Sequence, residues 1–124
     1  MNNLLKTYAC QKPFSIPEKI QNNLKEKIQK SDFLVTDQKA THRLIGIHYD
    51  PKKRDSPIIT CICMRHEMVM AKQIAFSLGK KIYYHSKVSA RIFNYYEGEE
   101  LRFEDFNVVA VLYADYLARN NLGI

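Results

Sequence analysis

The sequence has no tryptophan, only four glycines and three cysteines in 124 residues, and no long apolar run. The glycines are scattered at positions 46, 79, 98 and 123, so no glycine-rich loop is present to cradle a phosphate. No segment approaches the ~20 apolar residues that a membrane-spanning helix needs. The N-terminal sequence also lacks the apolar region and cleavage site of a signal peptide. We therefore expect a cytoplasmic protein that meets a membrane only through partners.

The cysteines and histidines give no recognisable reaction centre. An odd number of cysteines without an export signal predicts reduced thiols. Cys61, Cys63 and His66 form a Cys-x-Cys-x-x-His cluster, but zinc takes four ligands and no second pair stands at usable spacing. No cysteine or histidine lies in a known triad or elbow motif. We expect no metal, no cofactor and no enzymatic activity.

The composition is that of one globular domain, with 46% hydrophobic and 26% charged residues. The net charge of +6 favours acidic partners, nucleic acid or anionic lipid. No basic run exceeds Lys52-Lys53-Arg54, and charge spread in this way is ordinarily a solvated surface. A group of aromatic residues offers either a stacking platform for bases or ordinary core: Tyr83, Tyr84, Phe93, Tyr95 and Tyr96. A small basic nucleic-acid-binding domain is therefore the alternative function.

Residues 1–32 read as a leader followed by an amphipathic linker helix. Ser15 and Glu18 form a Ser-x-x-Glu capping box at the start of this helix. One thin apolar stripe recurs every four residues, at Ile16, Ile20, Leu24 and Ile28. Such a narrow stripe predicts an appended helix that packs against one surface, not an element of the core.

Residues 33–124 read as an α/β domain. Strands are predicted at 33–36, 43–49, 57–64 and 81–85, and helices at 66–78, 87–96 and 104–121. This β-β-β-α-β-α-α order indicates a small four-stranded mixed sheet flanked by about four helices, counting the N-terminal one. The nearly all-apolar segment 57–64 predicts a central strand, and 57–85 a right-handed parallel crossover. The last helix is apolar almost all round, which predicts the most buried helix.

Several segments from residue 41 onward follow one another in an informative order. They are THRLIGIHYDP (41–51), SPIITCICM (56–64), AKQIAFSLGKKIYY (71–84), VSARIF (88–93) and FEDFNVVAVLYADYL (103–117). From His42 onward this series resembles the cytoplasmic domain of the FlhB/YscU (SctU) family, the export-apparatus switch proteins of bacterial flagella and type III secretion systems. The resemblance covers roughly two thirds of the chain.

The family's mark is an Asn-Pro-Thr-His loop between its first two strands, where the asparagine cyclises onto its own carbonyl and cuts the chain before the proline. Thr41 and His42 match the last two positions, but Lys39 and Ala40 stand at the first two. A lysine amine is normally protonated and cannot form the five-membered succinimide. The resemblance therefore implies a loop that has lost its autocleavage.

An alignment with a longer loop leaves this conclusion unchanged, because Asp37-Gln38 would then be the nearest equivalent and still supplies no Asn-Pro bond. The degenerate cleavage loop comprises Asp37, Gln38, Lys39, Ala40, Thr41 and His42. The chain also departs from the family at 62–65, where a Lys-Gly-x-Asp turn is common. The family's four preceding transmembrane helices are missing as well, so we expect a free-standing diverged copy or a fragment of a longer protein.

The resemblance implies a non-cleaving switch domain that binds export-gate components, secretion substrates or a ruler protein. It implies no small-molecule substrate. The expected working surface is the loop 37–42 with the adjoining turn 50–56, which presents Lys52, Lys53 and Arg54. The resemblance leaves open whether the system is flagellar or virulence-type.

Overall fold

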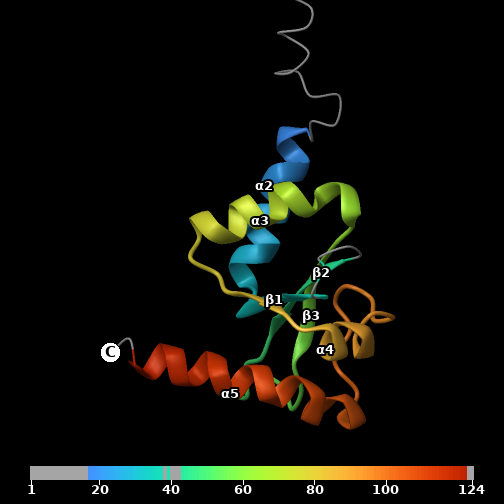
Figure 1. Ribbon diagram of the computed structural model, residues 1–124, viewed down its shortest axis with the longest axis vertical. Helices are drawn as coiled ribbons and strands as arrows, with labels where there is room; N and C mark the ends of the chain where they lie inside the picture. The colour runs from blue at the N-terminus through green and yellow to red at the C-terminus, as the bar shows by residue number, and fades with distance from the viewer. Residues whose placement is uncertain (1–16, 38, 40–42, 123–124) are drawn as a thin grey trace, which may run out of the picture.

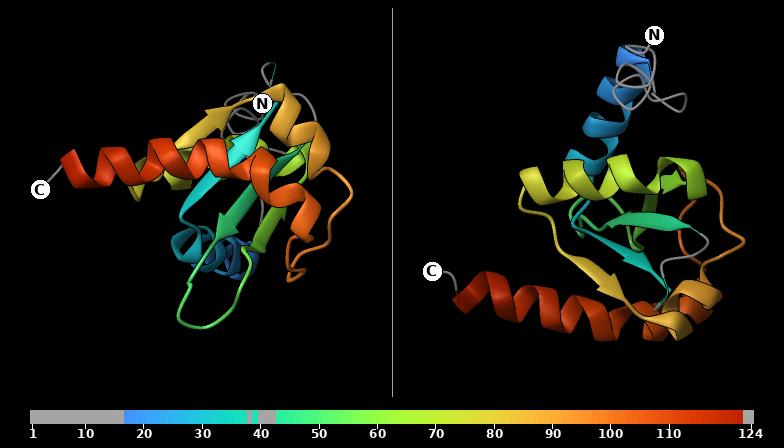
Figure 2. Two further views of the ribbon diagram at one scale, coloured as in Figure 1. Left: turned by 90° about the horizontal axis from the view of Figure 1, so that it is seen from below. Right: turned by 45° about the horizontal axis from the view of Figure 1, so that its top comes forward.

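The computed structural model describes residues 17–37, 39 and 43–122. One mixed sheet lies between two helical layers, with α2 and α3 on one face and α4 and α5 on the other (Figures 1 and 2). The elements are α2 (Glu18–Lys30), β1 (Phe33–Thr36), β2 (Leu44–His48), β3 (Ile58–Cys63), α3 (Met68–Ser77), β4 (Ile82–Tyr84), α4 (Ser86–Arg91) and α5 (Phe106–Leu122), with short 3-10 turns at Arg65–Glu67 and Phe103–Asp105. The predicted α/β class and element order are confirmed.

The strand order is β3-β2-β1-β4. β1 is antiparallel to β2 and parallel to β4, and β2 is antiparallel to β3. The sheet is therefore mixed, and β3 and β4 run in the same direction across helix α3, as the predicted crossover requires. Gly79 follows the C-cap residue of α3 and has a φ of 71°, the left-handed conformation that glycine commonly adopts just after a helix.

The prediction that 57–64 is a central strand is wrong. β3 is an edge strand, and the central positions belong to β2 and to β1, whose four residues are all buried. Part of the β3 edge is covered by the segment 98–101, because the Ile59 amide donates to the Glu99 carbonyl at 2.9 Å and the Gly98 amide to the Ile59 carbonyl at 2.7 Å. This cover and the two helical layers explain why an edge strand has a core-like sequence.

A β-bulge at Thr60 divides the side chains of β3 between the two layers. Gly46 pairs with Cys61 while the next residue, Ile47, pairs with Ile59, so Thr60 is an extra residue in β3. Ile59 consequently faces α4 and α5, whereas Cys61 faces α2 and α3. A regular strand would have placed both on one face, since they are two residues apart.

Two hydrophobic clusters fill the space on either side of the sheet. The cluster under α4 and α5 contains Phe33, Val35, Ile45, Ile47, Ile59, Val88, Ile92, Tyr95, Leu101, Val109 and Leu112. The cluster under α2 and α3 contains Leu24, Ile28, Leu34, Leu44, Cys61, Cys63, Met68, Ala71 and Ala75. Leu44 and Ile45 lie in different clusters, as the alternation of side chains along a strand requires.

The expectation that the first helix stands outside the core is wrong for its second half. Leu24 and Ile28 of α2 are buried beneath the sheet, while Ile20, one turn earlier, is 46% exposed. Pro17 occupies the N-cap position and makes no side-chain cap bond. The predicted capping serine, Ser15, lies outside the described residues.

The expectation that the last helix is the most buried one is also wrong. Val109 and Leu112 of α5 are buried, but Val111 and Leu117 are 56% and 54% exposed. α5 lies across the outside of its layer and packs inward with one side only, since no described element covers the other side (Figure 2). Within the described residues, no helix is both long and apolar enough to cross a membrane.

Candidate functional site

The degenerate cleavage loop connects β1 to β2. Gln38, Ala40, Thr41 and His42 lie outside the described residues, so the predictions made for them stay predictions. Asp37 is half-buried next to the end of β1, and Lys39 is exposed.

Both ends of this loop are anchored to the structure around α4. The Thr36 hydroxyl donates to the Arg43 carbonyl at 2.8 Å, which closes the loop across its base. The Thr36 carbonyl accepts from the His85 amide at 2.8 Å. At the other end the Arg43 guanidinium donates to the Phe93 carbonyl at 2.8 Å and lies 4.4 Å from the centroid of the Phe93 ring. The loop is therefore displayed from a rigid base.

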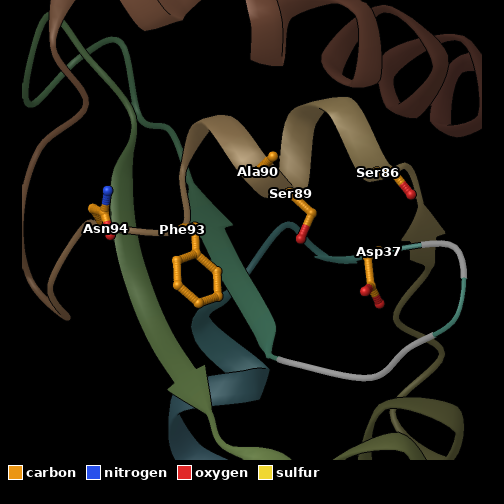
Figure 3. A pocket seen from close by; sticks show the side chains of 6 residues that line it. All are labelled: Asp37, Ser86, Ser89, Ala90, Phe93 and Asn94. Carbon is orange, nitrogen blue, oxygen red and sulfur yellow. The ribbon is translucent and has the colours of Figure 1, made fainter.

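A shallow hollow of about 430 Å³ lies beside the loop, between Asp37 and helix α4. Figure 3 shows Asp37 near Ser86 and Ser89, with Phe93 and Asn94 further along the hollow. The lining combines a carboxylate, hydroxyls and one aromatic ring, which suits contact with a peptide.

Helix α4 is fixed to the start of α5 through Asp105. This carboxylate is only 2% exposed and accepts hydrogen bonds from the Arg91 guanidinium and the Tyr95 hydroxyl. The Tyr95 oxygen in turn accepts from the Arg102 amide at 2.8 Å. Burial opposes ionisation, but the hydrogen bonds from Tyr95 and Arg91 outweigh it and hold the pKa of Asp105 below its usual value.

The sequence reading missed this network. Its signals were present, since Arg91 belongs to the VSARIF segment and Asp105 stands among the acids that precede the last helix. Their pairing could not be read from the sequence because 14 residues separate them.

The turn 50–56 does not adjoin the loop 37–42, contrary to the expectation. The loop leads into the first residue of β2 and the turn follows its last, so the two lie at opposite ends of a five-residue strand. In the left view of Figure 2 the turn projects from one end of the sheet. Asp50 shapes it, because its carbonyl accepts from the amides of Lys53 and Arg54 and its carboxylate from the amide of Lys52. The two predicted parts of the working surface are therefore separate sites.

A small apolar pocket lies beside the turn. It measures about 160 Å³ and is formed by residues on both sides of the turn and by α5: Tyr49, Pro57, Phe106, Val109, Ala110 and Tyr113. We call it the α5 pocket. Its lining is almost wholly apolar, so an apolar side chain of a partner is the chemistry that it fits.

Asp32 ties the floor of this region together. Its carboxylate accepts from the Tyr113 hydroxyl at 2.7 Å and from the Tyr49 amide at 2.8 Å, and it contacts His48 Nδ1 at 3.0 Å. Burial, together with the bond to Asp32, raises the pKa of Tyr113. The end of β2, the start of β1 and α5 are therefore held at one point.

The three residues of the Cys-x-Cys-x-x-His cluster, Cys61, Cys63 and His66, lie in two different environments. Cys61 and Cys63 are buried under α2 and α3, whereas His66 is exposed in the turn that follows. The contact with Cys61, together with burial, raises the pKa of Cys63, as fits a thiol that serves as core. No group of three potential metal ligands occurs among the described residues.

The aromatic residues do not form one stacking platform. Tyr95 is buried on Asp105, and Tyr83 packs edge-on against Phe33 at 5.1 Å while its hydroxyl donates to Asp115 at 2.5 Å. The structure thus gives no support to base stacking, which the nucleic-acid alternative would use.

Comparison with known proteins finds similarity in structure. No protein-family model matches the sequence, and no curated protein does. The structure is similar to a crystal structure of the EscU C-terminal domain with an asparagine-to-aspartate substitution, with a TM-score of 0.69 and 20% identity over 79% of this chain and 90% of that one. It is also similar to the cytoplasmic domain of FlhB from Shewanella putrefaciens, with a TM-score of 0.71 and 16% identity over 83% of this chain and 80% of that one.

A further EscU C-terminal domain, with a proline-to-alanine substitution, gives a TM-score of 0.65 at 20% identity, over 72% of this chain and 87% of that one. The fold implied by the sequence resemblance is therefore confirmed. The chain has the fold of the EscU and FlhB cytoplasmic domains.

Proposed function

We propose that this chain is a FlhB/YscU-family export-switch domain that acts in type III protein secretion without cutting itself. It works at the cytoplasmic face of an inner-membrane export apparatus and binds export-gate components or secretion substrates. It is not an enzyme, and it needs no cofactor. One observation carries the proposal: the segment that resembles the family's Thr-His loop joins the first two strands of a sheet with the EscU and FlhB fold.

The uncut state follows from the chemistry of the loop. Cyclisation of an asparagine requires a side-chain amide, and Lys39 carries no amide that could close the five-membered ring onto its own carbonyl. Mass spectrometry of the purified chain under denaturing conditions should therefore give one species of about 14.5 kDa. Two fragments that separate near residue 39 would refute the uncut state.

A gain-of-function variant tests whether the loop still has the family's position. The double variant Lys39→Asn/Ala40→Pro restores the Asn-Pro pair between the anchored residues Thr36 and Arg43. We expect this variant to yield two fragments divided between residues 39 and 40. The matched control is the single variant Lys39→Asn, which lacks the proline and should stay mostly intact. Equal cutting of both variants would contradict the proposed register.

Partner binding is the second part of the proposal. We assign it to the α5 pocket and the turn 50–56, since a small apolar pocket formed by residues on both sides of a projecting turn fits an apolar side chain of a partner's peptide segment. Ala110→Glu places a charge in the pocket from an exposed position, and the matched control, Ala118→Glu, lies two turns further along α5. In pull-downs with export-gate proteins and substrates, Ala110→Glu should reduce capture and Ala118→Glu should not. Capture that neither variant changes would rule out this pocket.

A further inference from the structure

A second, polar groove lies on the other side of the turn 50–56, where the turn meets the end of α2 and the loop after α3. It has a volume of about 650 Å³. The charged and titratable residues that line it are Lys30, Asp32, His48, Lys53, Arg54 and Lys80. We call it the basic groove.

Four cations face this groove from three separate segments. Lys30 comes from the last turn of α2, Lys53 and Arg54 from the turn 50–56, and Lys80 from the residues that follow Gly79. None of the four side chains has an ion-pair partner among the residues 17–37, 39 and 43–122. Unpaired cations that surround one concavity create a local positive potential that attracts anions.

Among the described residues, one carboxylate lines the groove, that of Asp32, and it already makes hydrogen bonds within the domain. Both oxygens of Asp32 are used, one by His48 and the other by Tyr49 and Tyr113. Asp32 therefore offsets one of the four charges, and three contacts within the domain already use most of its acceptor sites. Asp55 of the neighbouring turn does not line the groove. The site keeps an excess of positive charge and has hydroxyls in its wall, at Ser31 and Thr60.

We propose that the basic groove binds an acidic peptide segment of a partner protein, one rich in aspartate and glutamate. The proposal deepens the proposed function, on which it rests for the partner being a protein. Carboxylates are the natural complement of lysine and arginine side chains that come from several directions. Among the described residues that line the groove there is no phenylalanine, tyrosine or tryptophan, the large rings on which the bases of single-stranded nucleic acid stack most strongly.

The test uses the purified full chain and a fluorescently labelled peptide of alternating glutamate and glycine. Anisotropy at low salt should show binding that weakens as salt is added. Lys53→Glu/Arg54→Glu should weaken it by at least about tenfold, because two attractions become repulsions. The control Lys19→Glu/Lys25→Glu makes the same change in net charge at exposed positions of α2 outside the groove and should stay within about twofold of the parent.

Each outcome decides the matter. Equal weakening by both charge variants would show that the peptide responds only to the net charge of the protein. It would overturn the proposal that the basic groove is the binding site. Tighter binding of poly-uridine RNA or of phosphatidylserine vesicles, lost in the same groove variant, would overturn the choice of an acidic peptide. If the first variant does not fold, Lys30→Gln/Lys80→Gln repeats the test from the opposite wall. Because only purified components are used, failure here is separable from failure of the pull-down with export-gate proteins.

Discussion

Replacing Asp105 with asparagine should destabilise the protein more than any other acid-to-amide change that conserves size. The carboxylate is buried and accepts from both Arg91 and Tyr95. Asparagine keeps one acceptor oxygen but turns an NH2 group toward one of these donors, so one hydrogen bond is lost and the charge of Arg91 is no longer balanced. Hydrogen bonds to charged groups contribute about 1.5–3 kcal/mol each.

We therefore expect Asp105→Asn to lower the free energy of unfolding by about 2–4 kcal/mol. This loss is small for a broken ion pair because the Arg91 side chain is 50% exposed and stays hydrated after its partner is removed. Urea unfolding followed by circular dichroism at neutral pH measures this. The neighbouring Glu104→Gln is the matched control, since Glu104 is exposed, and it should cost less than about 0.5 kcal/mol.

Acidification gives the same prediction a second readout. The pKa of Asp105 is lowered in the folded state, so its contribution is fully present above the unfolded carboxyl value of about 3.9 and is lost as the pH falls through the folded value. The stability gap between the parent and Asp105→Asn should therefore narrow in acid. A gap that stays constant, or a cost no larger than that of Glu104→Gln, would refute the reasoning.

Three other predictions concern the core. Gly46→Ala should cost about 2–3 kcal/mol by urea unfolding, because a Cβ at this position would clash with the Ser31 hydroxyl and lie 2.7 Å from the Cys61 sulfur. A cost near zero would mean that the α2 layer shifts freely. Ile28→Ala should cost about 3 kcal/mol in the same assay, whereas Ile20→Ala on the exposed half of the stripe should cost less than about 1 kcal/mol. Equal losses of stability in Ile28→Ala and Ile20→Ala would contradict the burial of only the second half of α2. In a Cys10→Ser variant, neither Cys61 nor Cys63 should react with a disulfide reagent until the protein unfolds, because both side chains are buried and out of reach of the reagent. Rapid reaction of the native variant would show that β3 opens.

The local elements could be predicted from the sequence because their signals are local. The alternation at 44–48, the apolar spacing of α3 and Gly79 at its end each reflect interactions within a few residues. The order of the strands was not accessible in this way. A run such as 58–63 has the same composition whether it is central or is an edge covered by a loop, and the covering segment 98–101 lies far along the chain.

The candidate site was predictable in part for the same reason. The loop 37–42 was found because it carries a sequence pattern, and the cations of the turn because they are consecutive. The separation of the loop from the turn depends on the direction of β2. The basic groove depends on Lys30 and Lys80, which come from segments distant in sequence. Both are properties of the assembled sheet. The extra residue Thr60 likewise left no signal that distinguishes a bulge from a regular strand.

The central position of β1 decides what a cut in the loop 37–42 could do to the molecule. A break there would leave α2 and β1 on one fragment and β2 through α5 on the other, yet β1 pairs with both β2 and β4 and its side chains fill both clusters. The two fragments would stay together as one folded body, each completing the sheet of the other. In this architecture an intact loop and a cut loop would leave the same paired strands and the same two clusters, so a partner that distinguishes them would have to contact the loop itself.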